Sequence, residues 1–345
     1  MNSIERFMKT VAREEVDHPA SWLGMPDALS LPGLYEYFGV SDLKELKQKI
    51  DDDLYPVEIP YKSPTSDAIY AAFDFQQSGD VDSHDRTLTE EGWFADKEDV
   101  ASVDEFHWPE PERYISADAC EDLFQSVPKD KAILGMAWSA HFQDTCAAFG
   151  MENALMNMIA NPELYRAVDD KIVDFYLRAN KIFYECARGR LHAVLIGNDM
   201  GSQRGLMLSP DMIRQFVLPG AKRLVEQAKE YGLKVLYHSC GAISEIIPDL
   251  FDIGVDVVHP IQALAAGMEP ERLKEEFSGM GAFCGGVDTQ DLLVNGSAGD
   301  VKNKVRFLRR LFPSGLIISP SHEAIMPDVS PANIEAMFEA AKEQD

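Results

Sequence analysis

The sequence predicts an α/β fold: a closed (β/α)8 TIM barrel with an N-terminal elaboration. From about residue 130 onward, short apolar segments alternate with amphipathic helical segments, and the connections between them are short. Alternating strands and helices with short connections produce a parallel sheet, and six such units without a linker favour a closed barrel over an open sheet. The length of 345 residues also suits one barrel of about 250 residues with an added N-terminal part.

The individual elements follow from the hydrophobic pattern and from the turn residues. Each predicted strand is a short apolar run, at 132–138, 192–196, 233–237, 255–258, 281–284 and 316–319. The helices between and after them are predicted at 162–187, 210–230, 243–253, 270–277, 300–312 and 331–342. Three of these helices begin with an N-cap residue followed by proline, at 161–162, 209–210 and 330–331. Pro219 falls inside a predicted helix and is expected to kink it.

We expect residues 1–345 to form a single barrel domain, with 1–125 as the N-terminal elaboration and 126–345 as the repeated strand–helix units. The first two strands must then come from the N-terminal third, and residues 68–75 are a candidate for one of them. The rest of this third is irregular, acidic and aromatic, as in Trp93-Phe94 and Phe106-His-Trp-Pro109. It is expected to pack over the barrel.

The composition indicates which kinds of partner and which cellular compartment are expected. A formal net charge of −26 argues against nucleic acid and acidic membranes as partners, and against a strongly acidic substrate. The five cysteines are scattered without CxxC spacing, so we expect free thiols and a reducing compartment. No segment approaches about 20 consecutive apolar residues, and the N-terminus has no apolar signal region. A cytoplasmic protein is expected.

Polar residues gather where the predicted strands end. In a parallel barrel the functional side chains lie at the carboxyl ends of the strands. Here those ends read Asn198-Asp199, His238-Ser-Cys240, His259-Pro-Ile-Gln262, Asp288-Thr-Gln290 and Ser321-His322-Glu323. Their convergence is the main argument from the residues alone for an active site.

His238 and Cys240 are the best candidates for a metal site. Side chains two residues apart on an extended backbone point the same way, and an imidazole with a thiolate makes a good pair of zinc ligands. His322 is the first choice for a third ligand, and Cys284 competes with it. Cys284 lies inside a predicted strand, where a buried thiol packing the barrel interior is the alternative. The alternative for the pair itself is a hydrogen-bonded histidine beside an ordinary buried thiol.

The other strand-end residues suggest roles around the substrate. Asp199 is expected to act as a general base or to orient the substrate, with a turn-capping aspartate as the alternative. His259 is a candidate to contact the substrate or to support a ligand, with a satisfied core histidine as the alternative.

Four further residues are assigned to substrate binding at the same strand ends. Asp288 also follows a predicted strand, and a turn-capping aspartate is the alternative for it too. Asn198 and Gln262 are assigned as hydrogen-bonding residues, and Arg204 as a candidate to hold an anionic group. For Arg204 the alternative is an ion pair with surface carboxylates.

The second half of the chain resembles the uroporphyrinogen decarboxylase superfamily over about residues 130–342. The resemblance rests on Ser209-Pro-Asp-Met-Ile-Arg-Gln-Phe-Val-Leu-Pro219, Tyr237-His-Ser-Cys-Gly241, Gly285-Gly-Val-Asp-Thr289, Ser319-Pro-Ser-His322 and Pro331-Ala-Asn-Ile334. It implies a (β/α)8 barrel. The superfamily contains metal-free decarboxylases and zinc methyltransferases that work with corrinoid proteins.

Two departures favour the methyltransferase branch. The decarboxylases resemble one another in an N-terminal arginine-rich motif that grips a polycarboxylate substrate, but here no arginine lies between Arg13 and Arg86. The His-x-Cys motif is similar to the zinc motif of the methyltransferases, in which a later cysteine completes the site. This chain has His322 near that place.

The resemblance therefore implies a zinc-dependent methyltransferase. It would move a methyl group between a small methylated substrate or thiol and a corrinoid carried by a partner protein. His238, Cys240 and His322 would hold the metal, while Asp199 and His259 would orient the substrate. A decarboxylase of the family, and a non-catalytic barrel that binds a small molecule, are the alternatives.

Overall fold

The structure is a computed structural model that describes residues 1–77, 79 and 88–343. Its centre is a sheet of seven parallel strands in which each strand pairs with its neighbours in chain order. The strands are β2 (Leu54–Glu58), β3 (Ala132–Trp138), β4 (Ala193–Gly197), β5 (Lys234–His238), β6 (Val257–Ile261), β7 (Ala282–Val287) and β8 (Leu316–Pro320). Because every strand runs the same way, all carboxyl ends meet at one edge of the sheet.

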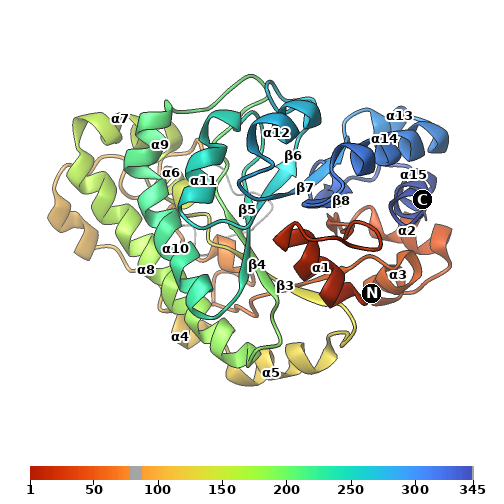
Figure 1. Ribbon diagram of the computed structural model, residues 1–345. Helices are drawn as coiled ribbons and strands as arrows, with labels where there is room; N and C mark the ends of the chain where they lie inside the picture. The colour runs from red at the N-terminus through yellow and green to blue at the C-terminus, as the bar shows by residue number, and fades with distance from the viewer. Residues whose placement is uncertain (78, 80–87, 344–345) are drawn as a thin grey trace.

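Residues 20–23 close the sheet into a barrel. The N–H of Trp22 donates to the carbonyl of Ile318 at 3.0 Å, and the N–H of Ile318 donates to the carbonyl of Ala20 at 2.8 Å. On the other side, the N–H of Asp53 donates to the carbonyl of Ser21 at 2.8 Å. This short segment therefore takes the place of a first strand between β8 and β2, and Figure 1 shows the N-terminal part of the chain beside β8. The predicted α/β barrel is confirmed.

Helices cover the outside of the strands, with α7 to α11 on one side and α13 to α15 on the other (Figure 1). They are α1 (Ser3–Ala12), α2 (Leu31–Phe38), α3 (Leu43–Ile50), α4 (Pro111–Tyr114), α5 (Ala117–Ser126), α6 (His141–Phe149), α7 (Met151–Ala160), α8 (Pro162–Ala187), α9 (Pro210–Phe216), α10 (Leu218–Glu230), α11 (Ile247–Asp252), α12 (Pro270–Phe277), α13 (Leu292–Asn295), α14 (Ala298–Leu311) and α15 (Pro331–Ala341). Short 3-10 helices span Ile69–Ala71, Val100–Asp104 and Ser244–Ile246. None of the described helices is long and apolar enough to cross a membrane.

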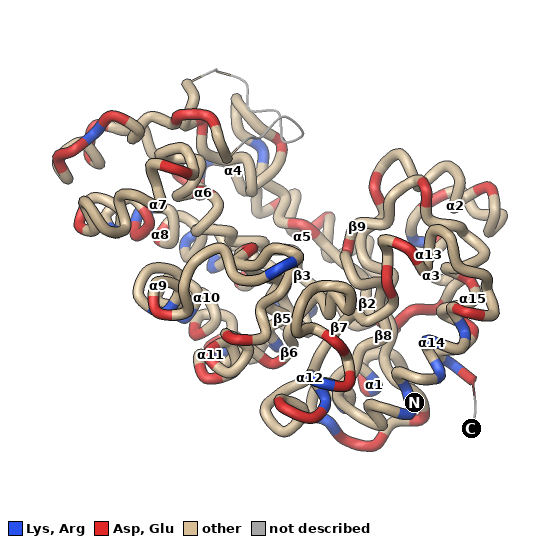
Figure 2. The backbone as a smooth tube through the Cα atoms, turned by 90° about the horizontal axis from the view of Figure 1, so that it is seen from above, with Lys and Arg blue, Asp and Glu red and all other residues tan. Residues whose placement is uncertain are grey.

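The pattern-based strands and helices of the second half agree with the structure to within a few residues. A kink was expected at Pro219. The predicted helix 210–230 is in fact divided at Val217, two residues earlier, into α9 and α10. A two-residue pair, β1 (Met25–Pro26) with β9 (Ala324–Ile325), lies beyond the main sheet. Figure 2 shows acidic residues spread over the surrounding helices and loops, which fits a solvated surface for most of the net charge.

The strand predicted at 68–75 is wrong. This stretch forms the 3-10 helix Ile69–Ala71 and a loop, and its aromatic residues make a different contact. Phe73 and Phe75 stack on each other with ring centroids 5.3 Å apart and pack against Phe106 and Trp108. The apolar run therefore belongs to an aromatic cluster of the N-terminal elaboration, and β2 supplies the strand.

The barrel interior is filled by alternate strand residues. Leu134 and Met136 of β3 point inward with Leu195 of β4 and Leu236 of β5, while the intervening residues face the helices. Phe7 of α1 packs into the same inner cluster. The inner core is thus packed with side chains, and polar chemistry is left to the carboxyl-end mouth.

Candidate functional site

The parallel register brings three strand ends together at the mouth. Gly197 at the end of β4 pairs with His238 at the end of β5, and His238 pairs with His259 of β6. A side chain at Gly197 would place its Cβ 2.0 Å from the carbonyl oxygen of His238, so the close approach of these two strands requires glycine. His238 is consequently fixed between the residues that follow β4 and those of β6.

His238 contacts a different pair of groups at each ring nitrogen. Its Nε2 lies 3.3 Å from Cys240 Sγ and 3.3 Å from Asp199 Oδ1. Its Nδ1 lies 3.1 Å from His259 Nδ1 and 3.4 Å from Glu323 Oε2. Four groups that can bind metals or exchange protons therefore surround a single buried imidazole.

The electrostatics at the mouth follow from these contacts. Burial lowers the pKa of His238, but Glu323, Asp199 and Cys240 outweigh it and place the pKa well above its ordinary value. The pKa of His259 lies well below its ordinary value, because burial and the neighbouring His238 both disfavour its charged form. Burial raises the pKa of Asp199, but hydrogen bonds from His238 and from the Cys240 backbone lower it, to about 2.

The geometry fits a zinc ion between Asp199, His238 and Cys240. One ligand atom from each of these residues lies within 4.8 Å of the other two. Ligand atoms of a tetrahedral zinc ion lie about 3.3–3.6 Å apart, given Zn–N of about 2.0 Å and Zn–S of about 2.3 Å. Both distances from His238 Nε2 are 3.3 Å, and an imidazole, a thiol and a carboxylate all belong to the donor types that zinc selects.

His322 stands at the edge of this group. Its ring is 6.1 Å from the ring of His238, and a hydrogen bond with Cys240 raises its pKa. Its Nδ1 accepts the backbone N–H of Ala324 at 3.0 Å, which places the ring proton at Nε2 when the ring is neutral. Direct ligation by His322 therefore requires the ring to give up this bond, whereas Asp199 already points its Oδ1 at His238.

Two of the residues predicted to contact the substrate are engaged inside the protein. Asn198 is buried: its Oδ1 accepts the N–H of Phe142 at 2.8 Å, and its Nδ2 donates to the hydroxyl of Tyr237 at 2.9 Å. Gln262 accepts the N–H of Gly241 at 2.6 Å and so supports the turn that follows Cys240.

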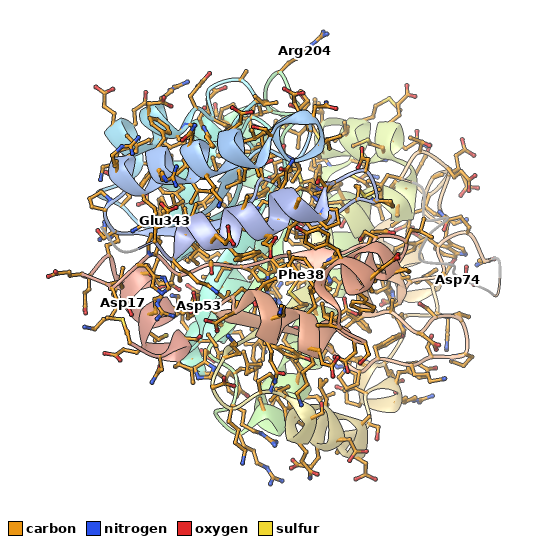
Figure 3. The ribbon with its side chains drawn as sticks, turned by 90° about the vertical axis from the view of Figure 1, so that its right-hand side faces the viewer. Asp17, Phe38, Asp53, Asp74, Arg204 and Glu343 are labelled. Carbon is orange, nitrogen blue, oxygen red and sulfur yellow. The ribbon has the colours of Figure 1, made fainter. Side chains whose placement is uncertain are left out.

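The remaining predicted residues lie away from His238. Asp288 accepts the backbone N–H groups of the next turn, including that of Asp291 at 2.8 Å. Arg204 is exposed and projects away from the molecule, as Figure 3 shows. Cys284 is fully buried in the barrel interior, where burial raises the pKa of its thiol. The structure thus gathers Asp199, His238, Cys240, His259 and His322, and separates them from these three.

Several residues of the mouth were not assigned from the sequence. Glu323 follows His322, is nine-tenths buried, and approaches both His238 and His322. Trp138 and Glu58 end β3 and β2 and line the same cavity. Because Glu323 directly follows the predicted ligand His322, the sequence could have indicated its place in the site. Nothing in the hydrophobic pattern marks Trp138 or Glu58.

A cavity of about 470 Å³ opens at the mouth above these groups. His238, Asp199 and Glu323 line it, and Trp138 and Tyr70 supply aromatic surface. No lysine or arginine occurs among the described residues that line it. The cavity is large enough for a small organic molecule, and its lining does not suit a polycarboxylate.

Comparisons with known proteins agree with this architecture. The sequence model of the family described as uroporphyrinogen decarboxylase (URO-D) matches residues 90–344. The solved structure of a methyltransferase from Methanosarcina mazei is similar in fold, with a TM-score of 0.66 and 14% identity over 99% of this chain and 98% of that chain. A protein named as a candidate vitamin-B12-independent methionine synthase from Listeria monocytogenes has a TM-score of 0.45 and 10% identity, over 95% of each chain. No curated protein matches the chain.

Proposed function

The chain belongs to the uroporphyrinogen decarboxylase family, and we propose that it is a zinc-dependent methyltransferase of that family. In this proposal it moves a methyl group between a small methylated substrate or thiol and a corrinoid carried by a partner protein. The observation that carries the proposal is the donor group at the mouth, in which Cys240 Sγ and Asp199 Oδ1 each lie 3.3 Å from His238 Nε2, and His238 and Asp199 line a cavity. The methyltransferase name of the similar Methanosarcina mazei structure supports it.

The ligands in this proposal are His238, Cys240 and His322, with Asp199 as the competing third donor. Bound zinc lowers the pKa of a coordinated thiol, so that a thiolate able to attack a methyl group exists near neutral pH. Three protein ligands would leave zinc one position for a substrate atom.

The surrounding residues would hold the ligands in place. Asp199 accepts the backbone N–H of Cys240 at 2.8 Å and so orients that residue. His259 and Glu323 both face Nδ1 of His238, which directs Nε2 toward Cys240. His259 is fully buried against Trp22, with ring centroids 5.2 Å apart, so its part in the proposal is to position His238.

The absence of cationic side chains from the described cavity lining supports a methyltransferase over a decarboxylase of the family. A substrate with several carboxylates, placed in this cavity, would meet the carboxylates of Asp199 and Glu323 and no lysine or arginine among the described lining residues. Conversion of uroporphyrinogen to coproporphyrinogen by the purified protein would overturn this part of the proposal.

Metal content tests the zinc site. The purified protein is expected to contain one equivalent of zinc, which Cys240→Ala removes and Cys284→Ala retains. Cys284 is the matched control, because it is a cysteine of the same barrel that lies in the interior away from His238. A metal-free protein that transfers methyl groups at full rate would refute the proposal. Comparing zinc affinity in His322→Ala and Asp199→Asn decides which residue provides the third ligand.

A further inference from the structure

Trp138 is held at the wall of the cavity by an irregular end of β3. The register of β3 against β4 shifts between Met136 and Trp138, which marks a β-bulge. Trp138 and Ser139 both have left-handed backbones, with φ of +52° and +53°. Left-handed backbone conformations are unfavourable for residues other than glycine, and bulges next to functional sites re-aim side chains. Such strain at a cavity wall points to a role for the indole that it places there.

The indole of Trp138 faces both the candidate metal site and an acidic side chain. Its ring lies 6.0 Å from the ring of His238 in an edge-on arrangement. Its N–H lies near the carboxylate of Glu58 without direct hydrogen-bond geometry, at the adjacent end of β2. The wall at this point therefore combines a large aromatic ring with a carboxylate.

The cavity as a whole is acidic. Asp27, Glu58, Asp199 and Glu323 all line it, and lysine and arginine do not occur among its described lining residues. Glu323 is nine-tenths buried, and its Oε2 has no hydrogen-bond partner among the described residues. Even with a zinc ion held by a cysteine thiolate, the four carboxylates leave the cavity with net negative charge. Such a cavity repels anions and attracts cations.

We propose that the cavity binds its methylated substrate as an ammonium cation, with the N-methyl groups against the indole of Trp138 and the charge balanced by Glu58 and Asp27. This inference rests on the proposed methyltransferase function and names its substrate class. Tryptophan is the best of the aromatic side chains for binding a quaternary ammonium group.

Transfer of a methyl group from such a substrate balances with the acceptor alone. The nucleophilic acceptor forms a bond to the methyl carbon, the C–N bond breaks, and the electron pair remains on nitrogen. The amine that is left takes up a proton from water at neutral pH, so the product keeps a positive charge but has one N-methyl group fewer to place against the indole.

Binding of choline and of its uncharged isostere 3,3-dimethylbutan-1-ol, measured by calorimetry on the protein as purified, tests the inference. The two compounds have nearly the same shape and differ in charge. We expect choline to bind about tenfold more tightly. Trp138→Leu should reduce this preference, because only the contribution of the carboxylates remains, and Trp138→Phe should reduce it less. Equal affinity of the wild-type protein for the two compounds, or tighter binding of the uncharged one, would overturn the inference.

Glu58→Gln should weaken choline binding and leave the isostere unaffected. Glu105→Gln is the matched control, because Glu105 is exposed and lies outside the cavity, so its loss should change neither affinity. Circular dichroism of each variant shows whether it is folded. Zinc measured in the same samples separates the two proposals: zinc without a choline preference overturns only this inference, and a choline preference without zinc overturns only the zinc-dependent function.

Discussion

Removal of Arg6 is expected to destabilise the closure of the barrel more than removal of any exposed arginine. Arg6 Nη1 contacts Asp53 Oδ1 at 2.6 Å, and the side chain of Asp53 is 1% exposed. The other oxygen of Asp53 accepts the N–H of Ser21 at 2.8 Å, in the segment that closes the sheet. Figure 3 shows Asp53 beside Asp17, the second partner of Arg6.

The size of the effect follows from the burial of the two carboxylates. Arg6→Ala leaves Asp53 as a buried charge without its cation, which typically costs about 3–5 kcal/mol. Asp17 is 38% exposed, so its pair with Arg6 adds only about 0–1 kcal/mol. We therefore expect the free energy of unfolding to fall by about 3–5 kcal/mol.

Urea unfolding at pH 7, followed by circular dichroism and tryptophan fluorescence, measures this loss. Arg223→Ala is the matched control, because Arg223 also contacts two carboxylates, Asp170 and Asp174, which are 67% and 57% exposed. Arg223→Ala should lower the free energy of unfolding by about 0–1 kcal/mol. A loss in Arg6→Ala no larger than that in Arg223→Ala would refute the reasoning from burial.

Two further predictions concern acid stability and the site. The hydrogen bond from Arg6 holds the pKa of Asp17 well below its usual range. The stability that this pair provides is therefore fully present above the pKa of Asp17 in the unfolded chain, about 3.9. It is lost as the pH falls toward the lower pKa of Asp17 in the folded protein. The urea midpoint of the wild-type protein should therefore fall more steeply between pH 5 and pH 3 than that of Arg6→Ala; parallel profiles would contradict this. Gly197→Ala forces a Cβ against the carbonyl of His238 and should lower both the thermal midpoint and the zinc affinity, the latter about tenfold or more. Gly205→Ala, whose Cβ would meet no atom within 4 Å, should change neither, and equal effects of the two variants would contradict the steric argument.

The second half of the fold was predictable because most of its strands are short apolar runs between amphipathic helical segments. The first two strand positions could not be predicted in this way. One is the short segment around Ser21, which is too brief to show periodicity, and the other contains Pro56, which normally argues against a strand. Residues 68–75 form an apolar run like that of a buried strand, but Phe73 and Phe75 pack together outside the sheet.

The composition of the mouth was predictable only in part. Parallel strands align their carboxyl ends, so the meeting of Asp199, His238 and Cys240 follows from their places at or just beyond the ends of β4 and β5. The direction of a side chain just beyond a strand depends on the turn, which is why Asn198 faces inward to a backbone N–H. The position of the Trp138 side chain depends on a β-bulge and on left-handed backbone conformations, which no sequence pattern predicted.

X-ray absorption at the zinc edge of the purified protein tests the central proposal most directly. We expect one sulfur ligand at about 2.3 Å, from Cys240, with the remaining ligands nitrogen or oxygen at about 2.0–2.2 Å. A Cys240→Ala sample should lose the sulfur signal. Two sulfur ligands would contradict the assigned donors, and a protein that binds no zinc would contradict the proposed zinc-dependent chemistry.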